Sequence, residues 1–469
     1  MPWQPQVPPA RAGLTWQTPA KDDSIAQQIP VVDWHPRPDG SGVPLRILVL
    51  ADLGGRDREG ALSERSLLRL DAARLDDLRR ARAADPEADA KVESSLESLA
   101  FLLSRCAPYA VVVDALDCRK RELEEDFEDA LDLTRSALYR TLHADVYHTR
   151  GALPFGLVVG DFEFGPSVVD VLVLRSIARV AARAQVHFIA GCSPALFGLS
   201  RWSELPTLAS PADAASSAPW NALRASPEAR YLGLCLPRFA LDERLWANAA
   251  FAFAARVATS YTTFGWSPNI VGLHPVAGGY INLRAPGDAR PARLDAVVTE
   301  ATERALRACG VIALTLDPTT GDGCFLAAPS CHAPPVAPRS DAVLQADWDS
   351  SETALEALNA LVCSQIPFML IATRFAQEVM VHARDGDHPR DREALVASLT
   401  RSTEPLVTVF EDAAPGIRAR RPMRVAKLTL REHEDGAGYA FTLHVRPVHR
   451  PRSVPYFFVL TVEGRLDVG

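Results

Sequence analysis

The amino-acid sequence predicts a mixed α/β protein, with a central mixed sheet flanked by helices and antiparallel strands at the C-terminal end. Three observations lead to this fold class. The near-continuous apolar run 155–159 is typical of a strand buried on both faces of a sheet. Residues 168–183 carry apolar side chains at three- and four-residue spacing, which indicates a helix packed on one face. Alternating β-branched residues in the last segment indicate antiparallel strands.

The chain begins with a proline-rich region, residues 1–44, which we expect to be an extended arm. Prolines recur throughout this region and prevent regular helix. The arm is not purely polar, because Trp3, Trp16 and Trp34 are spread along it. It is either a disordered tail or a segment that docks its aromatic side chains, or adds a strand, on a neighbouring subunit.

Strands and helices then alternate, as expected for a sheet covered by helices. Apolar runs predict strands at 45–50, 109–113, 155–159, 187–190, 231–236 (ended by Pro237) and 311–316. Helical periodicity predicts helices at 62–84, 90–105, 168–183, 245–264 and 293–309, and one apolar face along 122–143. Residues rich in proline and small side chains indicate surface loops at 204–227 and 328–340.

The C-terminal part changes character. We expect one long helical region at 351–384, a short helix near 391–401, and strands at 424–430, 439–445 and 456–462. The predicted organisation is therefore an arm (1–44), a short segment (45–90), a central α/β region (91–340) and a helical region with C-terminal strands (341–469).

Composition excludes several classes of protein. The net charge of −8, from 50 basic and 58 acidic residues, argues against a binder of nucleic acid or anionic membranes. The eight cysteines have no CxxC spacing, which is typical of reduced, buried thiols in a cytosol. The first residues lack signal-peptide features, and no apolar run reaches the length of a membrane helix. We expect a soluble, cytoplasmic protein without direct membrane insertion.

Common catalytic and nucleotide-binding motifs are missing from the sequence. No Gly-Lys dipeptide occurs, so there is no phosphate-binding P-loop. The glycine pairs do not extend to GxGxxG, and neither a GxSxG elbow nor an HExxH motif is present. We therefore expect no nucleotide cofactor and no metalloprotease-type zinc site.

One pair of carboxylates is a candidate for chemistry. Asp161 and Glu163 follow the buried run 155–159 and are two residues apart on an extended segment, so they share a face. Such a pair can bind a divalent cation or act as acid and base. The structural alternative, which we favour, is that they cap the following helix or pair with arginines at the sheet edge.

Cysteine and histidine residues provide two further candidates. Cys324, Cys331 and His332 are potential zinc ligands, but no fourth ligand lies nearby in the sequence, so we expect no metal. Cys192 with His187 is a potential nucleophile and base if the two residues meet across a turn, but burial of the thiol is the favoured interpretation. The sequence therefore predicts no catalytic residue.

Aromatic residues and two arginines complete the candidates. Trp246, Asn248 and Phe251, and likewise Tyr261, Phe264 and Trp266, have a spacing that suits packing better than stacking on bases. Arg230 and Arg238 flank the strand at 231–236 and are potential ion-pair partners.

An ordered series of segments resembles the large sheath subunit of a type VI secretion system. These segments are 154–164, 187–198, 220–238, 245–254, 264–266, 278–279 and 374–376. Weaker likeness runs back to about residue 96 and forward to the final strands. The resemblance implies a contractile-sheath-like fold and assigns roles in folding or assembly to Gly160, Asp161, Phe162, Phe164, Ser193, Pro194, Arg230, Tyr231, Pro237, Arg238, Trp246, Asn248, Trp266, Arg374 and Phe375.

The start of the chain resembles the small sheath subunit instead. The segments that carry this likeness are 49–55, 62–65, 70–71 and 75–78. The chain therefore looks like a fusion, in which a truncated small-subunit-like segment (45–90) precedes a large-subunit-like region (91–469). A tether raises the effective concentration of two parts that belong together. The family's histidine after Arg-Phe-Ala is replaced by Gln377.

The resemblance implies a mechanical function. Subunits would assemble as a helical homo-oligomer around an inner-tube protein and contract, with baseplate components, a separate small sheath subunit and a recycling unfoldase as further partners. Two alternatives remain open: a non-polymerising paralogue that acts as an adaptor or baseplate partner, and an enzyme that uses Asp161 with Glu163 or Cys192 with His187.

Overall fold

The computed structural model describes most of the central chain and part of the C-terminal region. The described residues are 43–54, 61–83, 90–128, 132–273, 278–284, 290–333, 360–385, 396–397, 421, 423–432, 438–447 and 460–467. The arm expected at 1–44 lies almost wholly outside these ranges, as do most of the helix expected at 391–401 and of the loop expected at 328–340.

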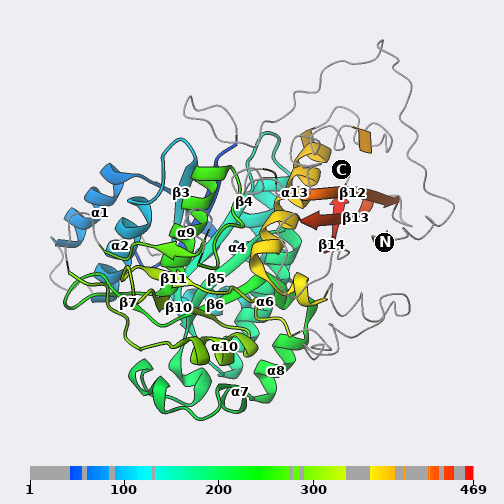
Figure 1. The fold of residues 1–469 in the computed structure, drawn as a ribbon. Coiled ribbons are helices and arrows are strands. Elements are labelled where there is room, and N and C mark those ends of the chain that lie inside the picture. The colour runs from blue at the N-terminus through cyan, green and yellow to red at the C-terminus, as the bar shows by residue number, and fades with distance from the viewer. Residues whose placement is uncertain are drawn as a thin grey trace, which may run out of the picture. The chain divides into compact units, whose positions relative to one another are not determined.

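A nine-stranded mixed sheet forms the centre of the fold (Figure 1). Its strands, in spatial order, are β2 (Leu68–Leu70), β3 (Val111–Asp117), β1 (Leu45–Ala51), β4 (Phe155–Phe164), β5 (His187–Cys192), β6 (Leu232–Leu236), β10 (Ile312–Leu316), β11 (Gly323–Phe325) and β9 (Tyr280–Ile281). The run from β3 to β10 is parallel, whereas β2, β11 and β9 pair antiparallel. This arrangement confirms the predicted fold class.

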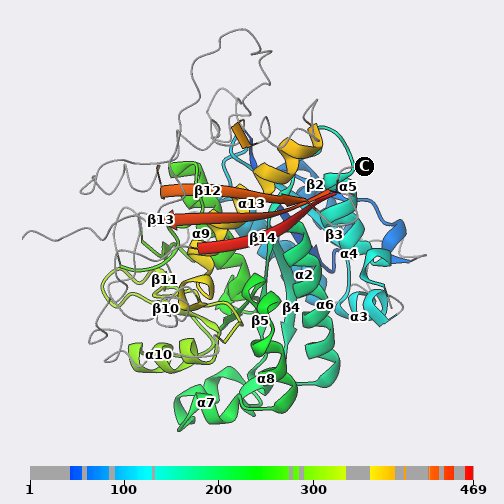
Figure 2. The ribbon, with the colours of Figure 1, turned by 90° about the vertical axis from the view of Figure 1, so that its right-hand side faces the viewer.

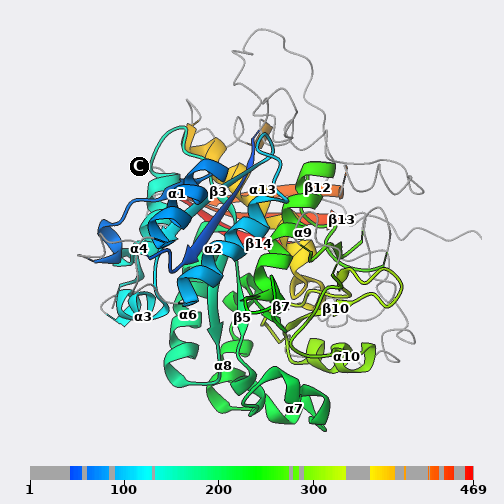
Figure 3. The ribbon, with the colours of Figure 1, turned by 90° about the vertical axis from the view of Figure 1, so that its left-hand side faces the viewer.

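Helices cover both faces of the sheet. On one face lie α2 (Ala90–Leu103) and α9 (Ala249–Phe264), which Figure 3 shows in front of the strands. On the other face lie α6 (Val168–Ala184), α3 (Lys120–Glu128) and α8 (Ala218–Ala225), as Figure 2 shows. Side chains of β1 alternate between the two layers: Ile47 and Val49 join the core beneath α9, and Leu48 joins the core beneath α6.

Local sequence explains the ends of the two main helices. The Ser167 side chain accepts a hydrogen bond from the backbone N–H of Asp170 and so caps the start of α6. The helix ends at Gln185, whose backbone is left-handed (φ 53°). The Asn248 side chain caps α9, and Gly265 (φ 75°) ends it.

The C-terminal region contains a long helix and a separate sheet. The helix α13 (Ile366–Asp385) is largely buried and contributes to both apolar cores. Strands β12 (Met423–Glu432), β13 (Gly438–Pro447) and β14 (Leu460–Asp467) form a three-stranded antiparallel sheet that contacts α13. Antiparallel C-terminal strands were predicted here; residues 456–459 of the last expected strand lie outside the described residues.

Several boundaries differ from the predicted ones. The helix expected over 62–84 is interrupted by strand β2 and becomes α1 (Ala72–Ala83), because Leu68 and Leu70 add an antiparallel edge to β3. The stretch 122–143 is not one helix: α3 ends at Glu128, and a series of short helical turns begins at Leu133. The sharp turns there are capped by Asp132 and Ser136.

Three further predictions about the central region were wrong in part. The loop expected over 204–227 contains short helices, including α7 (Pro211–Ala214) and α8, whose Trp220 is fully buried. The helix α10 spans only Glu300–Ala308, because Thr299 caps its start. Likewise the helix at 245–264 begins only at Ala249, after the short strand β8 (Trp246–Ala247), which pairs with β7 (Phe239–Ala240).

Among helices within the described ranges, none has the length and apolarity that crossing a bilayer requires.

Candidate assembly site

The residues singled out by resemblance gather at the two ends of the parallel strands. One group, which we call the carboxyl-edge cluster, lies where β4, β5 and β6 end, and it contains Gly160, Asp161, Phe162, Phe164, Ser193, Pro194, Pro237, Arg238, Trp246 and Asn248. The other, the amino-edge cluster, lies where these strands begin, and it contains Arg230, Tyr231, Trp266, Arg374 and Phe375.

Asp161 connects β4 to α2. Its carboxylate is buried, accepts hydrogen bonds from Lys91 Nζ at 2.8 Å and Ser95 Oγ at 2.6 Å, and lies within strand β4 rather than after it. The pairing of β4 with β5 shifts between Gly160 and Glu163, so this part of the strand bulges. A buried carboxylate with two donors fixes the position of a helix on a sheet.

Glu163 and Asp295 share one arginine. Arg238 Nε donates to Asp295 Oδ2 at 2.7 Å and lies 3.8 Å from Glu163 Oε1. Burial raises the pKa of both carboxyl groups, and the nearby guanidinium opposes that rise. Asp161 and Glu163 therefore each have a basic partner at the sheet edge, which matches the structural interpretation rather than an acid–base pair.

Asn248 joins three elements. Its Oδ1 accepts from the backbone N–H of Ala250, and its Nδ2 donates to the carbonyl oxygen of Phe162 at 3.1 Å. A side chain at Gly191 would not fit, because its Cβ would lie 2.5 Å from Nδ2 of Asn248. The neighbouring carbonyl of Trp246 accepts from Ser94 Oγ of α2 at 2.7 Å.

The remaining carboxyl-edge residues pack the ends of β4 and β5. The backbone N–H of Ser193 donates to the carbonyl of Phe164 at 2.9 Å, and Ser193 caps the short helix that begins at Pro194. A Cβ at Gly160 would lie 2.7 Å from the Phe188 ring, so the ring requires glycine there. The peptide bond before Pro237 is cis.

The amino-edge cluster ties α13 to the sheet. Gln377 Nε2 donates to the carbonyl oxygens of Phe155 at 2.6 Å and Gln185 at 2.9 Å. Arg374 donates to Tyr261 Oη at 3.3 Å. The Trp266 and Phe375 rings stack with centroids 5.5 Å apart; a small pocket lies beside them. Gln377 thus joins the first residue of β4 to the residue that ends α6 through neutral hydrogen bonds.

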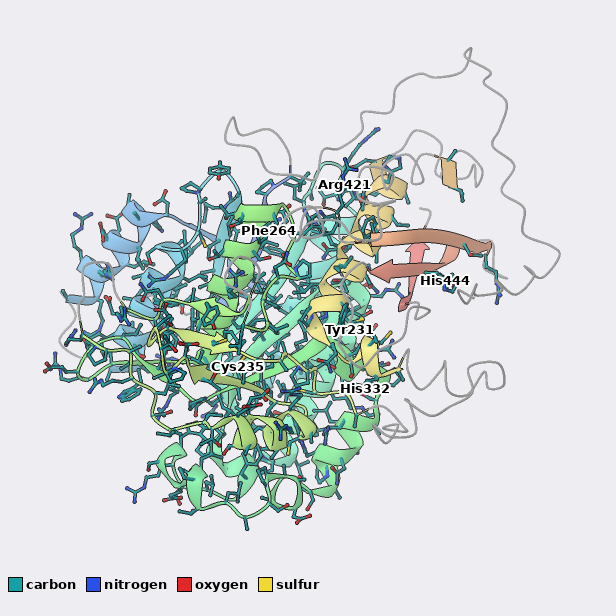
Figure 4. The ribbon with its side chains drawn as sticks, viewed as in Figure 1. Tyr231, Cys235, Phe264, His332, Arg421 and His444 are labelled. Atoms are coloured by element: carbon teal, nitrogen blue, oxygen red, sulfur yellow. The ribbon has the colours of Figure 1, made fainter. Side chains whose placement is uncertain are left out.

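Tyr231 and Arg230 have different surroundings. Tyr231 is buried beside α13 (Figure 4), and its hydroxyl donates to Gln185 Oε1 at 3.2 Å. Arg230 donates instead to the carbonyl of Pro227, and no ion pair to Arg230 is found in the described ranges. An ion pair is thus present for Arg238, whereas the described residues show only a backbone hydrogen bond for Arg230.

His187 and Cys192 cannot form a catalytic pair. They are the first and last residues of β5, which places them roughly 16 Å apart with side chains on opposite faces. Both are buried. Burial raises the pKa of the Cys192 thiol well above its usual value and lowers the pKa of His187 to about 3. The enzyme interpretation based on this pair is wrong because the turn that it required is a continuous strand.

The candidate zinc ligands are engaged elsewhere. His332 Nδ1 lies 3.0 Å and 2.9 Å from the carbonyl oxygens of Arg224 and Ser226, whereas Cys324 lies in β11. Within the described residues no three His, Cys, Asp or Glu side chains form a group that could hold a metal ion. The candidate base-stacking residues Phe251, Tyr261 and Phe264 are buried in the core, as packing predicts.

The C-terminal sheet adds a different feature, open strand edges. Its order is β12–β13–β14, so β12 and β14 each have one side without a partner strand in the described part of the chain. Such edges present backbone N–H and C=O groups to a further strand.

Sequence reasoning found the C-terminal strands, but it missed Lys91, Ser95 and Asp295 of the carboxyl-edge cluster. The hydrogen-bond partners of these three residues lie 57 to 70 positions away in the chain.

Comparisons with known proteins agree with a structural role. The sequence model described as "EvpB/VC_A0108, tail sheath N-terminal domain" matches residues 86–244 and 240–332, and the model described as "EvpB/VC_A0108, tail sheath gpW/gp25-like domain" matches 355–461. A Pseudomonas aeruginosa protein named type VI secretion system sheath protein TssC1 is 24% identical over 403 residues, which cover 74% of this chain and 75% of the relative.

Two crystal structures of sheath tail proteins also align with this chain. The protein from Desulfitobacterium hafniense is 10% identical with a TM-score of 0.42, and the alignment covers 91% of this chain and 97% of that one. The protein from Listeria innocua is 9% identical with a TM-score of 0.43, over 91% and 96% of the two chains.

Residues of both clusters hold helices against the sheet through hydrogen bonds, as Asp161, Asn248 and Gln377 do. The family models together match well over half of the chain, so the chain belongs to the EvpB/VC_A0108 tail sheath family. Together with the TssC1 relative, this membership makes it a structural subunit of a type VI secretion sheath.

Proposed function

We propose that this subunit assembles with further copies of itself into a helical tube around an inner-tube protein, and that contraction of the tube drives effector delivery. The observation that carries the proposal is the C-terminal sheet of a member of the tail sheath family, in which β12 and β14 each have one side without a partner strand among the described residues. An edge that accepts a strand from the next copy creates a head-to-tail contact, and contacts that do not close on themselves produce filaments.

The arm 1–44 and the tail 439–469 are the segments that we propose to supply strands between copies. The test deletes residues 1–40 from the full chain and examines purified protein by negative-stain electron microscopy. Filaments should disappear. A chain whose first 40 residues are replaced by a Gly/Ser linker of equal length should behave like the deletion, and intact filaments in either variant would refute this assignment.

The fused organisation is a finer proposal. The matched family region begins at residue 86, yet the strand between β3 and β4 is β1, which comes from residues 45–51. Residues 45–90 thus supply a central strand from outside the matched region. We infer that this segment does the work of a truncated small sheath subunit within the same chain, with β1 covering two strand edges that would otherwise be open.

Cutting the chain between residues 86 and 87 tests the fusion. Fragment 87–469 alone should be insoluble, because β3 and β4 both lose β1, and co-expression with fragment 1–86 should restore a soluble complex. Soluble, folded 87–469 without its partner would show that the segment is dispensable.

Further partners follow from the same proposal. They are the inner-tube protein, baseplate components, a separate small sheath subunit that the fused segment could replace, and a recycling unfoldase, all in the cytoplasm. We propose no enzymatic activity, because Asp161 and Glu163 are both engaged with basic side chains.

The second candidate function is that of a non-polymerising adaptor or baseplate partner, and it rests on the shortness of segment 45–90. A full chain that never forms filaments with its inner-tube protein would favour this function.

A further inference from the structure

The contacts between segment 45–90 and the rest of the chain are one-sided in charge. Six ion pairs join described residues of the two parts, and in five of them the segment supplies the arginine and the rest of the chain supplies the carboxylate. These five pairs are Arg46–Asp114, Arg65–Glu122, Arg69–Asp114, Arg79–Glu97 and Arg82–Glu93. The sixth, Arg119 with Asp52, has the opposite sense. The surface that receives the segment therefore presents carboxylates to an arginine-bearing occupant.

Asp114 is the buried member of this acidic surface. Its side chain is 3% exposed, whereas the other three carboxylates are between 21% and 47% exposed. Exposed ion pairs contribute little, because water competes for them and salt screens them. A buried carboxylate that loses its cation is costly, because an uncompensated charge then remains in the interior. Asp114 is thus the residue of this surface that discriminates most strongly between occupants.

Two strands of the segment bring an arginine to Asp114, one on each side of β3. On the β1 side, Oδ2 of Asp114 accepts hydrogen bonds from Arg46 Nε at 3.2 Å and Nη2 at 2.8 Å. On the β2 side, Oδ1 accepts a hydrogen bond from Arg69 Nε at 2.6 Å. Each carboxylate oxygen therefore has its own arginine, and charge-assisted hydrogen bonds of this kind are both strong and specific in geometry.

Arg46 also reaches the strand on the other side of β1. Its Nη1 donates to the carbonyl oxygen of Leu153 at 2.5 Å, and its guanidinium carbon lies 4.0 Å from the centroid of the Phe155 ring, at the start of β4. One side chain thus contacts both neighbours of the position that β1 fills between β3 and β4, which we call the β1 slot. A lysine could not make these contacts together, because its ammonium lacks the planar fork of donors.

Both arginines have fixed places in the strand register. Arg69 is directly opposite Asp114 in the antiparallel pair of β2 with β3. Arg46 lies two residues before Leu48, which is opposite Asp114 in the parallel pair of β1 with β3. Successive side chains of a strand point to opposite faces, so a slip of one residue would turn Arg46 away from Asp114. Asp114 therefore favours one register of each neighbouring strand.

We propose that the β1 slot is a recognition surface with Asp114 as its specificity-determining residue, and that it selects a segment with arginines at the places of Arg46 and Arg69. An apolar strand is excluded, because it would leave Asp114 buried without a cation. This chain's own segment meets the requirement, and a separate small sheath subunit enters the slot only if it brings arginines to the same two places. The inference rests on the proposed role of segment 45–90 and names what that role requires of the occupant.

A swap of charged for apolar side chains tests the selection. The full chain carries a fluorophore at its N-terminus and a protease site between residues 86 and 87, and it is cut after folding. Dilution followed by analytical ultracentrifugation gives the dissociation constant of the labelled fragment. Asp114→Leu alone, and Arg46→Leu with Arg69→Leu, should each weaken binding about 100-fold, whereas all three substitutions together should restore it to within about tenfold of the parent.

The exposed pair of Arg79 and Glu97 is the matched control, and Glu97→Leu should change the dissociation constant less than about threefold. Thermal unfolding of the uncut variants shows whether each one folds. If the leucine variants do not fold, Arg46→Lys with Arg69→Lys keeps the charge, removes the fork, and should weaken binding about tenfold.

Three results would overturn the proposal: a triple variant as weak as its two halves, equal effects of Asp114→Leu and Glu97→Leu, or unchanged binding of the lysine variant. Filament formation by the uncut proteins is scored separately by electron microscopy. Restored binding in the triple variant of a chain that forms no filaments would refute sheath assembly and leave the recognition standing. Filaments from a chain in which the three substitutions show no such coupling would refute the recognition alone.

Discussion

The buried imidazole of His187 makes the stability of this protein depend on pH. His187 is fully buried at the start of β5, and its ring packs against Tyr231 with centroids 5.6 Å apart. Neither ring nitrogen has a hydrogen-bond partner among the described residues. Burial therefore disfavours the charged imidazolium and lowers the pKa to about 3, compared with about 6.5 for a free histidine.

The size of the effect follows from proton linkage. Between the two pKa values the unfolded chain binds a proton at this position and the folded chain does not, so stability falls as the pH falls. The contribution is fully present above about pH 6.5 and decreases by roughly 1.4 kcal/mol per pH unit below it. At about pH 5 the folded state should have lost about 2 kcal/mol relative to about pH 7.5 through this group alone.

The His187→Phe variant isolates this contribution, because phenylalanine keeps a ring against Tyr231 and removes the titrating group. Urea unfolding of both proteins at about pH 7.5 and about pH 5 gives the free energy of unfolding of each. The wild-type protein should lose about 2 kcal/mol more than the variant on acidification. An equal loss in both proteins, within about 0.5 kcal/mol, would show that His187 reaches solvent or a partner when protonated, and the linkage argument would fail.

Two further predictions concern the carboxyl-edge cluster. Asp161→Asn should lower the free energy of unfolding by about 1–2 kcal/mol, because it weakens charge-assisted hydrogen bonds in a buried site. The control Glu125→Gln, on the exposed face of α3, should change the free energy of unfolding by less than about 0.5 kcal/mol. Equal effects of the two substitutions in urea unfolding would contradict the role assigned to Asp161. Asn248→Ala should lose about 2 kcal/mol because it removes a helix cap and a buried hydrogen bond together, and Ser167→Ala, which removes only a cap, about 1 kcal/mol. If thermal unfolding shows the two alanine variants to be alike, the bond from Asn248 to Phe162 contributes nothing.

Periodicity predicted the elements that are long and strongly patterned. The helix at 168–183 was found nearly as expected, and the strand at 155–159 was found but continues to Phe164, because one or two buried faces leave a repeating signal in the sequence. The prediction of one apolar helical face along 122–143 was wrong, because the same apolar side chains can be buried by several short helical turns as well as by one long helix. The break between α3 and Leu133 depends on local caps that compete with a continuous helix.

The candidate site shows the same division. Sequence pattern singled out Asp161, Asn248 and Arg238, but their partners Lys91 and Asp295 carry no local signal. The same limit applies to His187 and Cys192. They are close in sequence, and only the continuous strand between them shows that their side chains point apart.

The sequence by itself determined the fold class, the absence of nucleotide-binding and metalloprotease motifs, and the family to which the ordered segments belong, because each of these depends on residue order and short-range periodicity. Only the tertiary structure decided that β1, from outside the matched family region, lies between β3 and β4, and that Asp114 meets arginines from both strands beside it. Strand order and side-chain pairing are set by contacts between distant parts of the chain, which no local pattern records.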